Sequence, residues 1–99
     1  MINTEILIAH IPVGKENAVS RQFLSLLLGT SDREMRKAIN AARREGHVIC
    51  NTQDGRGYFR SEDPADVLKQ YRQNERRAKS ILVQQKHLRR ILKDAGMDV

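Results

Sequence analysis

Apolar residues recur along the first third of the chain at spacings that predict short helices. Residues 3–9 fit a short helix or strand that Pro12 stops, and residues 10–19 are expected to form a loop. A helix follows, with Ser20 as its N-cap and Gly29 as a left-handed C-cap. Its apolar face is expected at Phe23, Leu24, Leu27 and Leu28.

The stretch SDREMRKAINAARREG, residues 31–46, predicts a second helix with clear ends. Ser31 and Glu34 form a capping box, in which the hydroxyl accepts from the N–H of Glu34 and the carboxylate reaches back to the N–H of Ser31. The helix is expected to run from Asp32 to about Glu45 and to end at Gly46. Its apolar positions, expected in the core, are Met35, Ala38, Ile39 and Ala42.

Only Thr30 separates the C-cap Gly29 from Ser31. Two helices joined by so short a turn cannot lie parallel, so they are expected to cross at a steep angle, as in a helix-turn-helix. HVIC and GYFR then predict two strands, joined by a turn that contains Asp54 and Gly55. An isolated hairpin is marginally stable, so this hairpin is expected to pack on the helices.

A long helix is predicted from Pro64, with Asp63 as N-cap, because neither Pro nor Gly intervenes before Ala95. One apolar cluster comprises Val67, Leu68 and Tyr71, and a second comprises Ile81, Leu82, Leu88, Ile91, Leu92 and Ala95. The heptads are interrupted, which argues against a strict coiled coil. The second cluster is expected either to fold back on the domain or to pair with a second copy, and a homodimer through the C-terminal helix is our expectation.

The stretch SRQFLSLLLGTSDREMRKAINAARREGHVI, followed by GRGYF, resembles the biotin-repressor type of winged helix-turn-helix domain and small DNA-binding proteins of phages and prophages. Ser25 stands at the small position of that motif, Gly29 at the turn glycine and Met35 at the apolar position of the second helix. The resemblance covers about residues 20–60. It implies a mostly α fold with a small β-hairpin wing (α+β) in residues 1–63. The long helix of residues 64–99 is not part of the common motif.

The resemblance also implies a DNA-binding surface on residues 32–45. The first turns of the second helix enter the major groove, so the expected base-reading residues are Arg33, Arg36, Lys37 and Asn40. Arg43 and Arg44 are expected to point outward and to complement the helix dipole or touch phosphate. Arg56 at the hairpin tip suits a narrow minor groove, and Thr30 and Ser31 could donate to phosphate. The alternatives are a solvated face with ion pairs, an ordinary turn charge and simple helix capping.

Charge favours a polyanionic partner, since 18 Lys and Arg face 12 Asp and Glu, a net charge of +6. Residues 1–63 hold nine basic and eight acidic groups, whereas residues 64–99 hold nine and four, so the excess is +1 and +5. The C-terminal helix is therefore expected to add backbone affinity through Arg72, Arg76, Arg77 and Lys79. The alternative is that these cations only keep the helix soluble.

Several function classes are not expected. The single Cys50 excludes an intrachain disulfide and suits a reducing cytosol, and no membrane span or export signal is seen, so a cytoplasmic protein is expected. The three histidines are scattered and no nucleophile lies beside a base, so no catalytic residue, metal or cofactor is predicted. We expect a small transcriptional regulator that binds double-stranded DNA. The alternative is an assembly module of a phage replication or packaging complex, and composition leaves RNA binding open.

Overall fold

The first three α-helices begin where capping side chains satisfy free backbone N–H groups. A computed structural model describes residues 2–99 and places α1 at Thr4–His10, α2 at Arg21–Leu27 and α3 at Asp32–Arg44. Asn3 Oδ1 accepts from the N–H of Glu5 at 2.7 Å. The Ser20 hydroxyl accepts from Phe23 at 3.0 Å, and the Ser31 hydroxyl accepts from Glu34 at 3.1 Å. The two serine caps predicted from the sequence are confirmed, and residues 3–9 lie largely in a helix rather than a strand.

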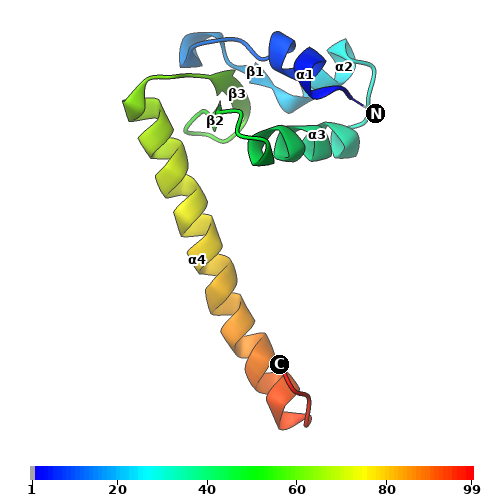
Figure 1. Ribbon diagram of the computed structural model, residues 1–99, viewed down its shortest axis with the longest axis vertical. Coiled ribbons are helices and arrows are strands. Elements are labelled where there is room, and N and C mark those ends of the chain that lie inside the picture. The colour runs from blue at the N-terminus through cyan, green and yellow to red at the C-terminus, as the bar shows by residue number, and fades with distance from the viewer. Residues whose placement is uncertain (1) are drawn as a thin grey trace. The chain divides into compact units, whose positions relative to one another are not determined.

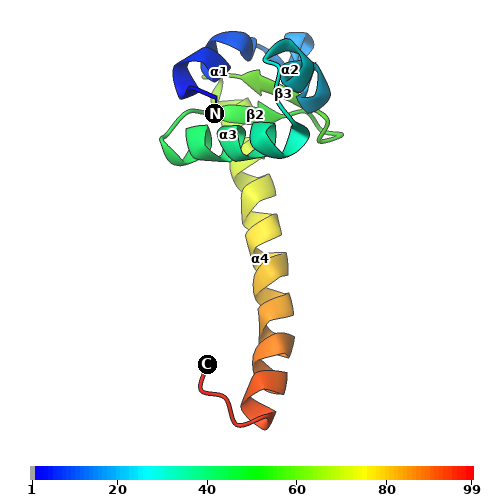
Figure 2. The same cartoon turned by 90° about the vertical axis from the view of Figure 1, so that its right-hand side faces the viewer.

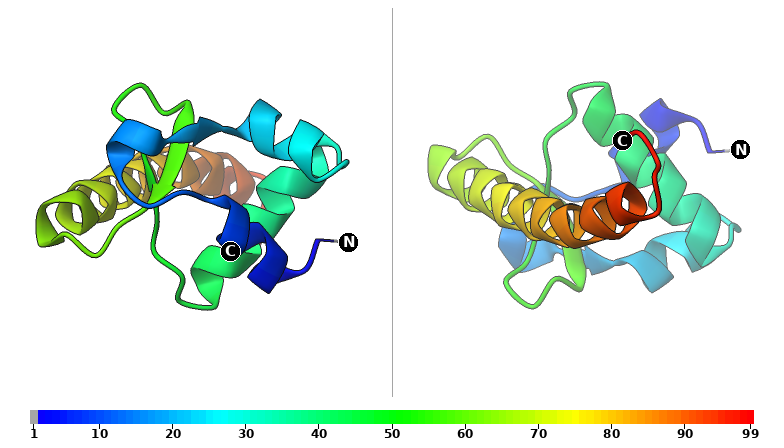
Figure 3. Two further views of the ribbon diagram at one scale, coloured as in Figure 1. Left: turned by 90° about the horizontal axis from the view of Figure 1, so that it is seen from above. Right: turned by 90° about the horizontal axis from the view of Figure 1, so that it is seen from below.

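The turn between α2 and α3 has the expected glycine. Gly29 has φ of +62°, the left-handed region that a side chain would strain. The N–H of Thr30 donates to the carbonyl of Ser25 at 2.9 Å and closes the end of α2. Figure 3 shows α3 leaving this turn at an angle to α2 rather than parallel to it.

The sheet has three antiparallel strands in the order β1-β3-β2. The strands are β1 (Val19–Ser20), β2 (Ile49–Asn51) and β3 (Gly57–Arg60). The predicted hairpin is therefore present as β2 and β3, with Cys50 paired to Phe59. The residues expected to form a loop before α2 also hold a short 3-10 helix, Lys15–Asn17, and β1, which pairs Val19 with Tyr58. A two-residue strand has no alternation of its own, so no sequence pattern revealed it.

One core joins the three helices to this sheet. It contains Leu7, Ile11, Leu24, Met35, Ile39, Ala42, Ile49 and Tyr58, each at most 7 % exposed. Figures 1 and 2 show α1 and α2 on one side of this core and α3 on the other. The apolar positions expected on α3 are confirmed at Met35, Ile39 and Ala42, while Ala38 is partly buried against the cluster.

The expected apolar face of α2 was wrong in part. Leu24 is buried and Leu28, the C-cap of α2, packs partly buried against the core, but Phe23 is 50 % exposed and Leu27 is 51 % exposed. The second buried side chain of α2 is Ser25, at 7 % exposure. A helix of seven residues presents only a narrow line to the core, and this line passes through Leu24 and Ser25.

The long helix α4 spans Pro64–Asp94 without a break (Figure 3). The carboxylate of Asp63 accepts from the N–H of Ala65 at 2.9 Å, which confirms the predicted cap. The chain divides into two compact units after Val67, within α4, whereas the sequence suggested a boundary before Pro64. Within the N-terminal unit, the Ser61 hydroxyl donates to Asp66 Oδ2 in the first turn of α4 at 2.8 Å. None of the described helices is long and apolar enough to cross a membrane.

Candidate nucleic-acid interface

The solvent-facing side of α3 is rich in cations. Asp32–Arg44 contains five basic residues against two acidic ones. The side chains of Arg33, Arg36, Lys37, Asn40 and Arg44 are all exposed. Their positions follow from the core, because Met35, Ile39 and Ala42 occupy the opposite side of the helix. The surface that results presents guanidinium, ammonium and amide donors.

Two of these cations form ion pairs within α3. Arg36 Nη2 lies 2.8 Å from Asp32 Oδ2, and Lys37 Nζ lies 3.9 Å from Glu34 Oε1. Both basic side chains remain 62 % exposed, so each pair is a surface pair of small energetic value. The Glu34 carboxylate thus pairs with Lys37, and only the serine half of the expected capping box is observed. This geometry fits both interpretations of α3 given by the sequence, a solvated helix face with ion pairs and an exposed binding face.

Arg43 departs from the outward position expected for it. Its Nη2 donates to the carbonyl of Ile49 at 2.8 Å and to Asn51 Oδ1 at 3.0 Å, and its Nε also donates to Ile49. The guanidinium carbon lies 5.8 Å from the ring centre of Tyr58. Arg43 directly follows the buried Ala42, on the side of α3 that faces β2. It therefore ties α3 to the sheet, while Arg44 remains exposed.

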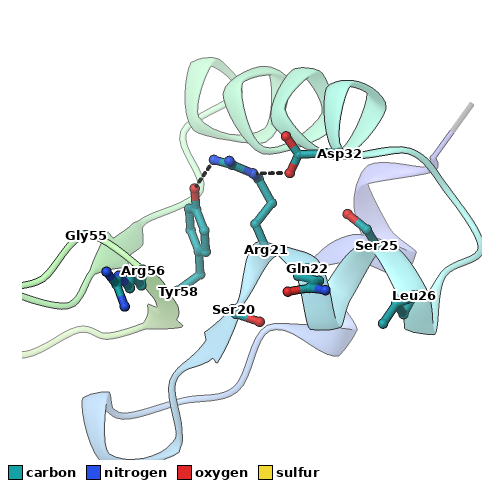
Figure 4. A pocket seen from close by; sticks show the side chains of 9 residues that line it. All are labelled: Ser20, Arg21, Gln22, Ser25, Leu26, Asp32, Gly55, Arg56 and Tyr58. Carbon is teal, nitrogen blue, oxygen red and sulfur yellow. Dashed lines mark hydrogen bonds and ion pairs between the residues drawn. The ribbon is translucent and has the colours of Figure 1, made fainter.

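An open depression of about 620 Å³ lies between the first turn of α2, the start of α3 and the tip of the β2–β3 hairpin. Figure 4 shows the side chains around it. They are Ser20, Arg21, Gln22, Ser25, Leu26, Asp32, Gly55, Arg56 and Tyr58. The depression therefore brings two arginines, Arg21 and Arg56, to a surface that also includes the N-terminal end of α3.

Arg21 was not singled out from the sequence, yet it occupies the middle of this arrangement. Its Nε lies 2.5 Å from Asp32 Oδ1, and its Nη1 lies 3.4 Å from the hydroxyl of Tyr58. The hydrogen bond to Asp32, and then that to Tyr58, raises the pKa of Arg21. Hydrogen bonds from Arg21 and Arg36 lower the pKa of the Asp32 carboxyl. The sequence did hold one signal for Arg21. Arg21 follows the N-cap Ser20, just as Asp32 follows the N-cap Ser31, and a cation at the first residue of a helix opposes the helix dipole unless an acidic partner lies nearby.

The hairpin tip is held by side-chain hydrogen bonds to its backbone. Asp54 Oδ1 accepts from the Thr52 hydroxyl and from the N–H of Arg56, the latter at 3.0 Å, and Gly55 has φ of +74°. The hydrogen bond from Thr52, and then that from the Arg56 backbone, lowers the pKa of Asp54. The side chain of Arg56 is exposed and makes no hydrogen bond or ion pair within the described residues. The hydrogen-bonded turn thus presents an exposed guanidinium.

The predicted phosphate donors lie at the turn between α2 and α3. The hydroxyl of Ser31 is exposed and already caps α3, and Thr30 is half-buried. Ser20 caps α2 in the same way and also lines the depression. Capping therefore explains both serines, while their exposure leaves them accessible to an anion. Ser25 Oγ is buried without a hydrogen-bond partner among the described residues.

The described residues gather no group of three or more His, Cys, Asp or Glu side chains that could hold a metal ion. Cys50 is 1 % exposed and faces the start of α4, with its sulfur 4.0 Å from the carbonyl oxygen of Asp66. Burial, and then the Asp66 charge, raises the pKa of its thiol, so the thiolate is disfavoured. No protein-family model, curated protein or solved structure matches the chain.

Proposed function

We propose that this protein binds double-stranded DNA as a winged helix-turn-helix protein, with α3 as recognition helix and the β2–β3 hairpin as wing. The element order supports this: α1, β1, α2, α3, β2 and β3, with β1 paired to β3. The observation that carries the proposal is the depression that brings Arg21, Arg56 and the start of α3 to one surface. Binding to a specific duplex site requires cations that contact phosphates and a helix that contacts bases on the same surface, because phosphate contacts position the protein while base contacts specify the site.

In this proposal the residues have two kinds of role. The exposed Arg33, Arg36, Lys37 and Asn40 read base edges in the major groove, where Arg suits guanine and Asn suits adenine. Arg21, Arg44, Arg56, Thr30 and Ser31 contact the backbone around them, with Arg56 close to the minor groove. Arg43 stays on the sheet and supports the helix. The biological role that we attach to this activity is that of a small phage or prophage transcriptional regulator.

Salt titration of duplex binding tests the proposal directly. The affinity for a random duplex should fall steeply with salt, and Arg36→Ala and Lys37→Ala should each weaken binding. Lys15→Ala is the matched control, because Lys15 is an exposed cation on the 3-10 helix, away from α3. It should bind as the unchanged protein does. A chain that shows no duplex binding at low salt would overturn the proposal.

A second candidate is a protein-interaction module of an assembly. It is favoured by the exposed side chains of Phe23, Leu26 and Leu27, of which Leu26 is 77 % exposed. They are spaced by three and four residues, so they share one face of α2. Substitution Leu27→Lys distinguishes the two functions, because Leu27 is 51 % exposed and, unlike Leu26, does not line the depression. Under the DNA proposal it leaves duplex binding intact or strengthens it, whereas loss of a complex with intact duplex affinity supports the second role.

A further inference from the structure

The part of α4 beyond Val67 exposes a series of large apolar side chains. Among residues 68–92 these are Leu68, Tyr71, Ile81, Leu82, Val83, Leu88, Ile91 and Leu92, which are between 36 and 65 % exposed. No residue of α4 is buried. An exposed apolar surface of this length on one helix is characteristic of an interaction site.

Seven positions of α4 alternate in steps of three and four residues and form one line along the helix. We call this line the α4 seam, and it comprises Tyr71, Asn74, Ala78, Ile81, Gln85, Leu88 and Leu92. Five of the seven residues are apolar. The two amide residues, Asn74 and Gln85, are what interrupts the heptad pattern.

Basic residues occupy the opposite side of the same helix. At 100° per residue, the positions facing away from the seam are Lys69, Arg72, Arg76, Lys79, Val83, Lys86, Arg90 and Lys93. We call this line the α4 basic stripe, and Val83 is its only uncharged member. The cations thus gather on one side of the helix. Of the large exposed apolar residues, Tyr71, Ile81, Leu88 and Leu92 lie on the seam, whereas Leu68, Leu82, Val83 and Ile91 lie off it.

We infer that the α4 seam binds the seam of a second copy of this chain in antiparallel orientation. In that orientation Asn74 lies opposite Gln85 of the second copy. A parallel pair in register would also place each amide against an amide, so the sizes of the apolar side chains decide the orientation. In the antiparallel pair Ala78 lies opposite Ile81, and Tyr71 lies opposite Leu88, so each small or medium side chain meets a larger one. A parallel pair would instead place Ala78 against Ala78 and leave a gap in the layer.

The charges on the helix also favour a second copy. The stripes of the two helices point away from each other, so their cations do not meet across the pair. Beside the seam lie Glu75, Arg77 and Arg89, so its margin carries a net charge of +1, against +7 for the stripe. An acidic partner would instead be drawn to the stripe. The seam therefore suits a partner surface that is apolar and weakly charged. The seam of a second copy has these properties, because none of its seven residues is charged.

The oligomeric state of the full chain tests this inference, which does not depend on DNA binding. Sedimentation equilibrium should give twice the 11.4 kDa mass of one chain at micromolar concentration. Ile81→Lys and Val83→Lys form a matched pair, because the two side chains are 51 and 53 % exposed but lie on opposite faces. We expect Ile81→Lys to sediment as a monomer and Val83→Lys as a dimer. A monomeric unchanged protein, or equal behaviour of the two variants, would overturn the inference.

Disulfide cross-linking tests the orientation. In a Cys50→Ala background, Asn74→Cys and Gln85→Cys should cross-link when the two variants are mixed, and neither should cross-link alone. A disulfide in Asn74→Cys by itself would show a parallel pair and contradict the antiparallel arrangement. Circular dichroism of each variant, compared with the unchanged protein, verifies that the helices are retained.

Discussion

Arg21 and Asp32 form an ion pair between the first residues of two consecutive helices, with Nε and Oδ1 2.5 Å apart. The carboxylate suits its position at the start of α3, but the guanidinium at the start of α2 opposes the helix dipole. Its contacts with Asp32 and Tyr58 offset that cost. The pair thus links α2 to α3 at the depression where we propose that a duplex lies.

Replacing Asp32 by Asn should lower the thermal stability at neutral pH, because it removes the partner of both Arg21 and Arg36. The folded-state pKa of Asp32 is depressed, so its contribution is present above the ordinary pKa and is lost as the pH falls. The difference in Tm between Asp32→Asn and the unchanged protein should therefore shrink below about pH 4. Glu62→Gln removes an exposed carboxylate and serves as control. A difference independent of pH would contradict this explanation.

Arg43→Ala should lower the free energy of unfolding by about 1–3 kcal/mol, because the carbonyl of Ile49 and the amide of Asn51 lose a charged donor. Arg44→Ala removes the same side chain from the next, exposed position. It should stay within about 0.5 kcal/mol of the unchanged protein. Urea denaturation measures both variants. Equal losses for the two would show that the contacts of Arg43 with the sheet contribute little.

Arg56→Gln should weaken duplex binding about tenfold without changing Tm, since its guanidinium makes no hydrogen bond or ion pair within the described part of the chain. The effect should be largest on A-tract duplexes, whose minor groove is narrow and strongly negative. Gln53→Ala alters the same exposed turn without a charge change. It should bind as the unchanged protein does. Fluorescence anisotropy with labelled duplexes measures both, and a loss of affinity shared equally by all sequences would argue against minor-groove insertion.

The α4 basic stripe should steepen the salt dependence of duplex binding. Converting Arg72, Arg76 and Lys79 to Gln should reduce the slope of log K against log salt by about 0.9 for each phosphate that the variant no longer neutralises. Val83→Lys fills the gap in the stripe and should increase the slope by about 0.9. An unchanged slope in both variants would mean that these cations only keep the helix soluble.

The sequence by itself determined the features that rest on near neighbours. The caps at Ser20, Ser31 and Asp63 and the left-handed Gly29 were predicted because each involves backbone groups within a few residues. The core face of α3 followed in the same way, since a helix of thirteen residues has a clear period. The long helix was predicted because nothing interrupts it.

Only the tertiary structure decided the contacts between elements. The buried side of α2, the pairing of β1 with β3, the Arg21–Asp32 ion pair and the attachment of Arg43 to β2 had no local pattern. Arg21 and Asp32 are eleven residues apart, and they meet because packing of Leu24, Met35 and Ile39 sets the angle between α2 and α3. Local hydrogen bonds are encoded in short stretches of sequence. Side chains on different elements meet only after the shared core has set how those elements cross.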